Sequence, residues 1–548
     1  MAMIRTVAMG YRAVGVEMRG DPSLGARWNI REDLYHQFGE IDQMMFDRYG
    51  EVGVRRRHDG RIFSLADCFY TASTKAGDIT PHEAVDGFSP GKHIAGTISH
   101  IEIIDDRCKD GTPNRHITLL PGPAPPSRPD GTRACKDMKT VLDRKPAFQV
   151  EARSVLMLLR RYLEAIEKLD TDRDNEPRVR VFKHHRVVHD ETGFVTMPDG
   201  RVRIQIEELQ EVDLGGKVIR IRAPNSPITD IGVPELFMIA QGAHSKDAER
   251  IGFVKKDVMV DHGDGRGLMV AQADYVAGLV EILVDGRVRV RIASEFDEHG
   301  QEHWVRQVAL GYENNPKVGW ILVEVPDFVS FDPIERERIA AGTDAGSPEY
   351  IASHTELVYE FYIEHAAAVL GLPKGEVQKC RTIYGPNLFR VAERKGDSAL
   401  VAVNGVVAGD SFGNGHFRSG GGAMTGMIGH AGRVSAYWQS RSDGMSALDA
   451  INYLADGIKE DTEAWLEVSA KEFTQPNPVI SGPERGKQIA AGGGMRKGGM
   501  NAARARHSLF GLSPSDWRGS HIRPGKTRCA PLPPLDPKHP AARRILMN

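Results

Sequence analysis

The stretch that decides the fold runs Val406-Val407-Ala408-Gly409-Asp410-Ser411-Phe412-Gly413-Asn414-Gly415-His416-Phe417-Arg418-Ser419-Gly420-Gly421-Gly422. Its apolar beginning predicts a strand that ends in Gly409-Asp410, and a helix is expected to begin near Gly421 after a glycine-rich loop. A carboxylate at a strand end can accept hydrogen bonds from ligand hydroxyls, and glycines at a helix start let backbone N–H groups approach a ligand. A strand–turn–helix whose glycines serve only tight packing is the alternative, and the spacing leaves both open.

A second segment of the same kind lies earlier in the chain and runs Pro234-Glu235-Leu236-Phe237-Met238-Ile239-Ala240-Gln241-Gly242-Ala243-His244-Ser245-Lys246-Asp247-Ala248-Glu249-Arg250. An apolar strand is expected to run into a turn of small residues and then into polar residues. On its own this pattern also fits an ordinary strand that ends in a small-residue turn.

Taken together and in this order, the two segments resemble the fingerprints of the class A flavoprotein monooxygenases, the para-hydroxybenzoate hydroxylase superfamily. The residues that match the GD fingerprint of that family are Gly409, Asp410, Gly420 and Gly422, and those that match its DG fingerprint are Gly242, Ala243, Ser245 and Arg250. Two positions depart from the pattern. Gln241 replaces the fingerprint Asp, so a hydrogen-bonding group without charge stands there, and Phe417 stands near the usual Pro.

The resemblance implies an α/β fold: a discontinuous Rossmann-like FAD domain with an inserted β-rich substrate domain. It implies FAD held by Gln241, Gly242, Gly409, Asp410 and the glycines Gly420, Gly421 and Gly422, with NAD(P)H as reductant. The activity it implies is oxygen transfer from molecular oxygen, through a flavin C4a-hydroperoxide, to an aromatic or polycyclic small molecule. Because the cofactor carries the hard chemistry, few catalytic side chains are expected. The glycine-rich loop that begins at Gly409-Asp410 is called the GD loop. His416 and Arg418, in this loop, are the candidates for a substrate or flavin contact.

Four further residues are expected at the cofactor. Glu17 ends the short strand predicted at 13–17, where an acid can bind an adenosine ribose, and Arg19 follows it. Arg31 begins a predicted helix and resembles the family's arginine near the flavin pyrophosphate. Arg153 opens the clearest amphipathic helix, predicted over 150–168. Each of the four also suits an ordinary solvated charge at the end of a strand or helix.

A Rossmann phosphate loop, Gly-x-Gly-x-x-Gly, is expected about 20 residues before such an acid, and the residues before Glu17 contain none. The first strand and phosphate loop of the family are therefore expected to be missing from this chain. A basic glycine-rich stretch over 490–499 is the other candidate for a phosphate contact; without a preceding apolar strand it is expected to be a loop.

The predicted organisation has four parts. Residues 1–178 form the first part of the FAD domain, with an insertion over 56–148. Residues 179–395 form the β-rich substrate domain and include the DG-like segment 234–250. Residues 396–474 form the second part of the FAD domain, in which 399–408 is expected to be one buried strand and 421–470 mostly helix. Residues 475–548 form a tail rich in Gly, Pro and Arg.

The bulk composition excludes several classes of protein. The 71 basic and 74 acidic residues give a net charge of 71 − 74 = −3, so nothing global attracts nucleic acid or an anionic membrane. No run approaches the roughly 20 apolar residues that span a bilayer. Five scattered cysteines without a C-x-x-C pair favour neither a disulfide framework nor a zinc site, and a cytoplasmic location is expected.

Two alternatives to a monooxygenase remain. One is an FAD-dependent oxidoreductase that catalyses a reaction without oxygen transfer, such as a dehydrogenation. The other is a degenerate flavoprotein-like scaffold that acts as a binding protein or partner subunit, which the missing phosphate loop suggests. The substrate's identity and the oligomeric state do not follow from the sequence.

Overall fold

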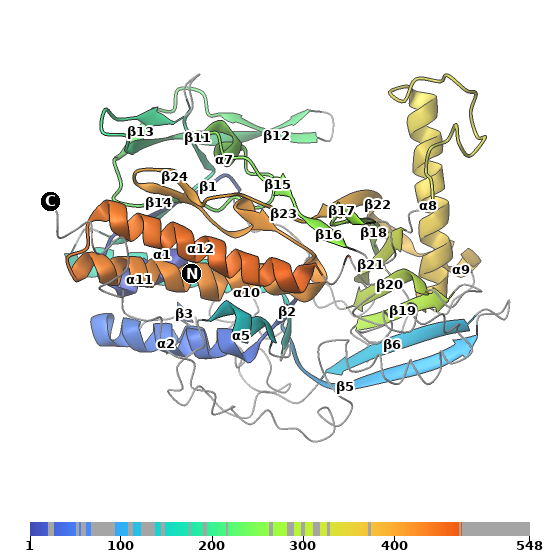
Figure 1. The fold of residues 1–548 in the computed structure, drawn as a ribbon, viewed down its shortest axis with the longest axis horizontal. Coiled ribbons are helices and arrows are strands. Elements are labelled where there is room, and N and C mark those ends of the chain that lie inside the picture. The colour runs from blue at the N-terminus through green and yellow to red at the C-terminus, as the bar shows by residue number, and fades with distance from the viewer. Residues whose placement is uncertain are drawn as a thin grey trace.

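The computed structural model describes residues 1–19, 27–50, 54–55, 62–66, 94–107, 113–121, 137–143, 148–174, 177–189, 194–214, 217–261, 267–281, 290–296, 302–310, 318–325, 329–370, 374–470 and 473. These ranges contain both helices and strands (Figure 1), as expected for a chain of mixed class. None of the helices in them is both long and apolar enough to cross a membrane. The predicted tail 475–548 lies outside the described residues, as does most of the predicted insertion 56–148.

Two short ladders of parallel strands occur in the described residues, and the second of them carries both sequence fingerprints. Strand β1 (Ala13–Glu17) pairs with β8 (Val179–Lys183), and β14 (Phe237–Ile239) pairs with β25 (Gly405–Val407). The DG-like segment therefore lies directly beside the GD segment, although about 170 residues of sequence separate the two strands. Parallel pairing places the carboxyl ends of both strands at the same edge.

The single buried strand predicted over 399–408 was wrong. Two antiparallel strands occupy it, β24 (Leu400–Ala402) and β25, joined by a tight turn. Asn404-Gly405 is a strong turn signal, and Asn404 is fixed from outside the hairpin. Its amide nitrogen donates to the carbonyl oxygens of Val202 and Pro234, and its Oδ1 accepts from the Val202 N–H.

The largest sheet has nine strands, and it unites segments from both sides of the predicted domain boundary at 178. Their spatial order is β2 (Arg27–Ile30), β7 (Phe148–Glu151), β5 (Ile94–Arg107), β6 (Pro113–Pro121), β19 (Val290–Phe296), β20 (Glu302–Leu310), β21 (Val318–Val325), β18 (Gln272–Glu281) and β22 (Arg381–Ala392). Strands from 94–121, inside the predicted insertion, thus pair with strands of the β-rich block.

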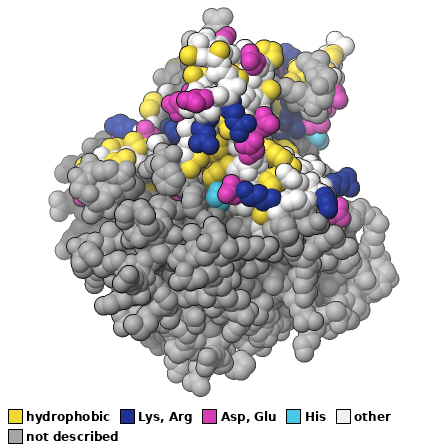
Figure 2. Space-filling model, turned by 90° about the vertical axis from the view of Figure 1, so that its right-hand side faces the viewer, with side chains coloured by type: hydrophobic (Ala, Val, Ile, Leu, Met, Phe, Trp, Pro, Cys, Tyr) yellow, Lys and Arg dark blue, Asp and Glu magenta, His cyan; other side chains and the backbone are white. Residues whose placement is uncertain are grey.

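Helix α8 (Pro348–Leu370) packs on one face of this sheet and stands at the right of Figure 1. It buries an apolar stripe against β18 and β21, in a core cluster that includes Val276, Val280, Ile321, Val323, Leu357, Val358 and Tyr362. Figure 2 views the molecule from this side and shows hydrophobic side chains gathered near the centre of the described surface, with acidic and basic ones around them.

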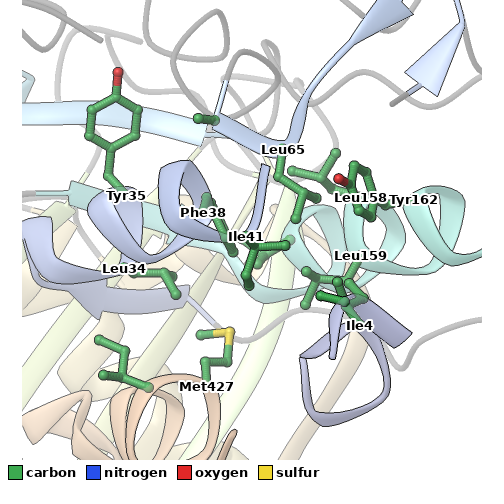
Figure 3. Close-up of a cluster of buried hydrophobic side chains, with 14 of the residues drawn as sticks. Ile4, Leu34, Tyr35, Phe38, Ile41, Leu65, Leu158, Leu159, Tyr162 and Met427 are labelled. Carbon is green, nitrogen blue, oxygen red and sulfur yellow. The ribbon is translucent and has the colours of Figure 1, made fainter. Parts of the chain in front are cut away.

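The second large core lies among helices. Its buried side chains come mainly from α1 (Ala2–Ala8), α2 (Glu32–Tyr49), α5 (Met138–Asp143), α6 (Ala152–Asp174) and α12 (Ala447–Ser469). Helix α11 (Ala431–Ser442) packs beside α1 and α12 and buries its apolar side chains in a separate cluster with β14 and β25. The helix predicted over 150–168 is confirmed as α6, and the predicted apolar stripe is buried at Val155, Leu158, Leu159, Tyr162, Leu163 and Ile166. Figure 3 shows part of this stripe packed between α1 and α2.

Several small elements complete the described fold. A five-stranded sheet contains β9 (His185–Val187), β10 (Val195–Thr196), β11 (Val202–Leu214), β12 (Lys217–Arg222) and β13 (Thr229–Gly232). The smaller sheets are formed by β3 (Val54–Arg55) with β4 (Ile62–Phe63), by β16 (Met259–Asp261) with β17 (Leu268–Val270), and by β15 (Lys256–Asp257), β23 (Arg394–Lys395) and β26 (Gly413–Asn414). The short helices are α7 (Lys246–Arg250), α9 (Lys374–Gln378) and α10 (Gly421–Met424).

A buried carboxyl occupies the junction between β22 and β23. Glu393 is fully buried, and neither carboxyl oxygen has a hydrogen-bond partner among the residues that the structure describes. Its backbone is held from both sides, since its N–H donates to Ala271 O and its carbonyl accepts from the Val258 N–H. Burial raises the pKa of Glu393 to about 8, with Lys395 opposing the shift.

Replacing Glu393 with Gln should therefore change how stability depends on pH. Because the folded-state pKa of Glu393 lies above its unfolded value, its stabilising effect is intact below pH 4.5 and is lost as pH rises through about 8. Relative to Glu393→Gln, wild type should lose up to about 1.4 kcal/mol of unfolding free energy per pH unit in that window. Urea unfolding at several pH values measures this loss. Glu349→Gln, at an exposed position on α8, is the control, and parallel pH profiles for wild type and Glu393→Gln would contradict the account.

Candidate functional site

The site is built at the carboxyl ends of β14 and β25. The register pairs Phe237 with Gly405 and Ile239 with Val407, and the Ala408 N–H continues the ladder by donating to Ile239 O. The loops that follow the two strands therefore start side by side. In α/β sheets this edge is the usual place for a ligand.

A turn at Gly409 separates Asp410 from the strand β25. Gly409 has a φ of +59°, which favours glycine, and its N–H donates to His430 Nδ1 at 2.9 Å. The other ring nitrogen of His430 lies 3.2 Å from Thr462 Oγ1. Burial lowers the pKa of His430 to about 4, so at neutral pH the ring is uncharged and Nδ1 is free to accept the Gly409 N–H.

Asp410 can be reached from solvent, although much of its carboxyl is surrounded by protein. The residue is exposed at the surface, yet burial by the surrounding protein raises the pKa of its carboxyl, and the charge of Lys255 opposes that shift. Its Oδ1 faces the start of α10, because a side-chain carbon at Gly422 would lie only 3.2 Å from it. A carboxylate that is both reachable and enclosed can accept hydrogen bonds from a ligand.

The DG-like loop is tied to the GD loop through Ser411. The Gln241 N–H donates to Ser411 Oγ at 2.8 Å, and that hydroxyl donates to the Gly242 carbonyl at 3.1 Å. Ser411 is fully buried. The residue that follows Asp410 in sequence thus fixes the relative position of the two loops.

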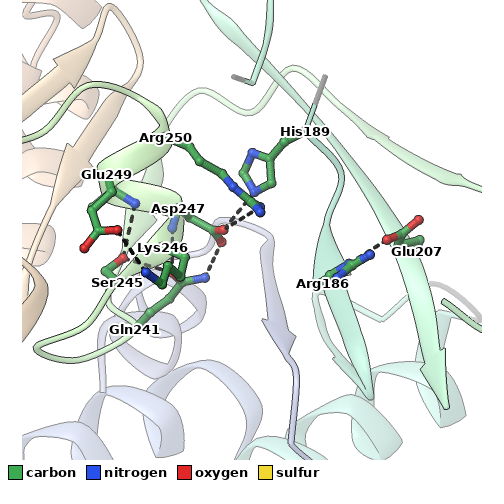
Figure 4. A network of polar contacts seen from close by, with 10 residues as sticks. Arg186, His189, Glu207, Gln241, Ser245, Lys246, Asp247, Glu249 and Arg250 are labelled. Carbon is green, nitrogen blue, oxygen red and sulfur yellow. Dashed lines mark hydrogen bonds and ion pairs between the residues drawn. The ribbon is translucent and has the colours of Figure 1, made fainter. Parts of the chain in front are cut away.

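A polar network holds the Gln241 side chain (Figure 4). Its Oε1 accepts from the Ser245 hydroxyl at 2.9 Å, and its amide nitrogen donates to the buried carboxylate of Asp247. Asp247 in turn lies 2.7 Å from His189 Nε2. Both polar atoms of the Gln241 side chain are therefore used within the protein, between α7 and the segment that carries His189.

Lys255 is a member of the site that the sequence did not reveal. Its ammonium donates to Ala243 O at 2.6 Å, to Asp410 O at 3.1 Å and to Asn414 Oδ1 at 2.9 Å. It therefore bridges the DG-like loop and the GD loop. Neither fingerprint contains Lys255. Its three acceptors are two backbone carbonyls and one side-chain amide, and two of the three lie more than 150 residues away in the sequence.

Arg31 and Ser419 hold the glycine-rich helix start. Arg31 is buried, and its Nη1 donates to Ser419 O at 2.7 Å; burial lowers its pKa to about 10, so it stays charged. Ser419 Oγ accepts from the Gly421 N–H and from Trp465 Nε1, each at 3.1 Å. The family resemblance predicted Arg31 near the flavin pyrophosphate and did not predict its contact with this loop, and the contacts of Ser419 and Trp465 were missed.

The glycines at 420–422 have a packing role of their own. Gly420 has a φ of +61° at the start of α10. A side chain at Gly421 would begin 2.1 Å from the Trp465 ring, and one at Gly422 would begin 3.0 Å from it. The spacing left open that these glycines serve only tight packing. Their contact with the Trp465 ring shows that packing accounts for part of the glycine pattern.

Of the two candidate catalytic residues, His416 lies differently from the groups above. His416 is fully buried: its Nε2 lies 2.8 Å from the Tyr275 hydroxyl, and its ring packs on Phe417 and Phe473. The structure thus buries the ring of His416, which belongs to the GD loop, against the large sheet. The side chain of Arg418 lies outside the described residues.

For two expected cofactor residues, Glu17 and Arg19, no hydrogen bond or ion pair to the loops around Asp410 is found in the described part of the chain. Glu17 and Arg19 are exposed at the carboxyl end of β1, where Glu17 Oε1 accepts from the Arg19 N–H at 2.8 Å. Arg153 is the second residue of α6, and its side chain lies outside the described residues.

An aromatic face of the large sheet approaches the GD loop. On the side of β18 opposite α8, Tyr275 stacks with Phe389 at 5.9 Å between ring centroids and meets the ring of Phe417 edge-on at 5.3 Å. Further along this face, Trp320 and Tyr384 make another edge contact. Phe389, Tyr384 and Phe417 are each substantially exposed, so the face is available to an apolar, planar molecule.

Comparison with known proteins gives only distant structural similarity. No family model matches the sequence, and no curated protein matches it. Among solved structures, p-nitrophenol 4-monooxygenase PnpA from Pseudomonas putida DLL-E4 is similar with a TM-score of 0.45 and 13% identity, over 93% of this chain and 94% of that one. The substrate-free rebeccamycin biosynthetic enzyme RebC gives a TM-score of 0.45 and 12% identity, over 93% of this chain and 74% of that one.

Aklavinone-11 hydroxylase, solved with FAD and aklavinone, gives a TM-score of 0.40 and 13% identity, over 82% of this chain and 62% of that one. At TM-scores and identities this low, the likeness establishes neither fold nor function for this chain.

The His430 contact predicts a specific dependence of stability on pH. The folded-state pKa of about 4 lies below the unfolded 6.5, so stability is full above pH 6.5 and falls as pH drops toward 4. His430→Gln keeps an acceptor for the Gly409 N–H but cannot titrate. Wild type should lose up to about 1.4 kcal/mol per pH unit relative to this variant, as measured by chemical unfolding. His354→Gln on α8 is the control, and an unchanged slope in His430→Gln would refute the assignment.

Proposed function

We propose that this chain is an FAD-dependent monooxygenase that acts on an aromatic or polycyclic small molecule. The observation that carries the proposal is a convergence. The GD turn with Asp410, the DG-like loop and the glycine-rich helix start meet at the carboxyl ends of two parallel strands. Segments that resemble two fingerprints of one family, far apart in sequence, thus meet in space.

The groups at this edge fit the flavin and ribityl parts of FAD. Asp410 offers an accessible carboxylate to the ribityl hydroxyls. The first turn of a helix also has N–H groups with no partner inside the helix, and those at Gly422 and Ala423 begin beside Asp410. They suit the oxygen-bearing edge of a flavin ring. Glu17, at the end of β1, suits an adenosine ribose.

When bound, FAD would supply the electron transfer and the activation of molecular oxygen. The residues of the chain bind, orient and shield. Arg31 and Ser419 hold the helix start, and Ser411 fixes the two loops against each other. The aromatic face with Phe389 and Phe417 supports an aromatic substrate, because stacking and apolar burial there would bring it next to the GD loop. The proposed reductant is NAD(P)H.

One observation favours a second candidate, an FAD-dependent oxidoreductase without oxygen transfer. Both polar atoms of Gln241 are engaged by Ser245 and Asp247. Gln241 thus lacks the charge of the family's Asp, and its amide is held by contacts within the protein and is not turned toward a nicotinamide cofactor by any partner. An enzyme whose flavin is reduced directly by its own substrate, in a dehydrogenation, does not need that contact.

Titration of the purified chain with FAD tests the proposal. Wild type should bind FAD, and Asp410→Asn should bind it about 10- to 100-fold more weakly, because hydrogen bonds to a charged acceptor are lost. Flavin fluorescence and visible absorption report binding, and Asp199→Asn, at an exposed turn, is the matched control. A chain that binds no FAD refutes both candidates and leaves the degenerate scaffold.

Oxygen and NAD(P)H consumption separates the two candidates. A monooxygenase should consume both when an aromatic substrate is present. A substrate-reduced flavoenzyme should bleach its flavin with substrate alone, in the absence of oxygen and NAD(P)H, and its flavin should not be reduced by NAD(P)H.

A further inference from the structure

Lys255 uses every donor it has to join the two loops of the candidate site. Its three N–H groups meet three acceptors: Ala243 O in the DG-like loop, and Asp410 O and Asn414 Oδ1 in the GD loop. Asn414 passes the connection on, since its amide nitrogen donates to Ala392 O at 2.5 Å at the end of β22. One ammonium therefore links the DG-like loop, the GD loop and, through Asn414, the large sheet.

The charge of Lys255 is not neutralised by direct contact. All three acceptors are uncharged, and no ion pair of Lys255 with a carboxylate occurs in the part of the chain that the structure describes. Burial lowers its pKa, and among the charged groups around it Asp410 and Glu249 of α7 favour the ammonium, whereas Arg394 of β23 opposes it. Arg394 is itself paired with Asp257.

The coupling between Lys255 and Asp410 works in both directions. Burial raises the pKa of Asp410, and Lys255 is the charge that lowers it again. Two oppositely charged, half-enclosed groups stabilise each other's ionised form. Without the ammonium, the carboxyl of Asp410 would take up a proton more readily and would lose part of its ability to accept hydrogen bonds.

The next residue in the chain shows that position, not local sequence, gives Lys255 this role. Lys256 carries the same charge but is exposed, and it pairs with the exposed Asp397. Within the described residues its ammonium makes no hydrogen bond or ion pair with either loop. The pair provides a matched comparison within two adjacent residues.

We propose that Lys255 is a positioning residue of the FAD site, one that locks the DG-like loop to the GD loop and keeps Asp410 ionised for the ligand's hydroxyls. The inference rests on the proposed function, since it assigns a role toward the same cofactor. It separates into a geometric part, which needs the three contacts, and an electrostatic part, which needs only the charge.

The test is the dissociation constant of FAD from about pH 5 to about pH 9, measured for wild type, Lys255→Met, Lys255→Arg and Lys256→Met. Lys255→Met removes contacts and charge, so FAD should bind about tenfold more weakly at high pH. The pH at which affinity falls on acidification should also move upward. Lys255→Arg should bind more weakly than wild type yet keep its pH profile, because the charge remains. Lys256→Met should match wild type in both respects.

Asn414→Ala is a second, milder variant in case Lys255→Met does not fold. It removes one acceptor and leaves the charge, so affinity should fall without a shift in the pH profile. The inference is overturned if wild type binds FAD while Lys255→Met has the same FAD affinity and pH profile as Lys256→Met. If Lys255→Met does not fold, the inference is overturned when Lys255→Arg and Asn414→Ala both have the FAD affinity and pH profile of Lys256→Met. If wild type binds no FAD at any pH, the proposed function fails first and this role fails with it.

Discussion

The three-residue parallel pairing of β14 with β25 is the constraint on which the site depends. The pairing is short, but the two strands lie very close to each other at Gly405 and Phe237. A side chain at Gly405 would begin 2.1 Å from the Phe237 ring, so the ring covers the backbone of the neighbouring strand directly. Asn404 fixes the turn before β25 by bonding to β11 and to Pro234. Everything at the carboxyl edge inherits its position from this pairing.

Polar contacts then convert that alignment into a defined site. Ser411 and Lys255 each join the DG-like loop to the GD loop through hydrogen bonds, and His430 accepts the N–H of Gly409. His430 ends a π-helical segment, Thr425–His430, which is continuous with α10 and α11. Such π-turns often occur at functional sites. Here the wider turn carries the imidazole that accepts the Gly409 N–H. The result is a carboxylate presented on a rigid frame, which suits binding by preorganised groups.

The sequence predicted the residues whose role is local. Gly409 and Gly420 carry positive φ angles, Asp410 follows a strand end, and α6 has an apolar stripe at helical spacing; all of these patterns are contained in a few consecutive residues. Arg31 was expected near the flavin pyrophosphate from the family resemblance, and the structure brings it to the GD loop, at Ser419. Its contact with a flavin stays a prediction.

What the sequence did not predict depends on long-range geometry. Lys255, His430 and Trp465 act on the loops through backbone groups and glycines that are 20 or more residues away or lie on other elements. His416 stands in a polar, glycine-rich loop, where local pattern gives no sign that its ring is buried against Tyr275. The nine-stranded sheet is equally nonlocal, because β6 pairs with β19, which follows it by more than 150 residues. The hairpin turn beside Asn404-Gly405, by contrast, could have been predicted from that dipeptide and was missed.

Amide hydrogen–deuterium exchange with and without FAD tests the central claim most directly. If the two fingerprints form one site, FAD should slow exchange together in 239–245 and in 408–424, with little change on α8. Binding of FAD that protects neither segment, or only one of them, would contradict the account.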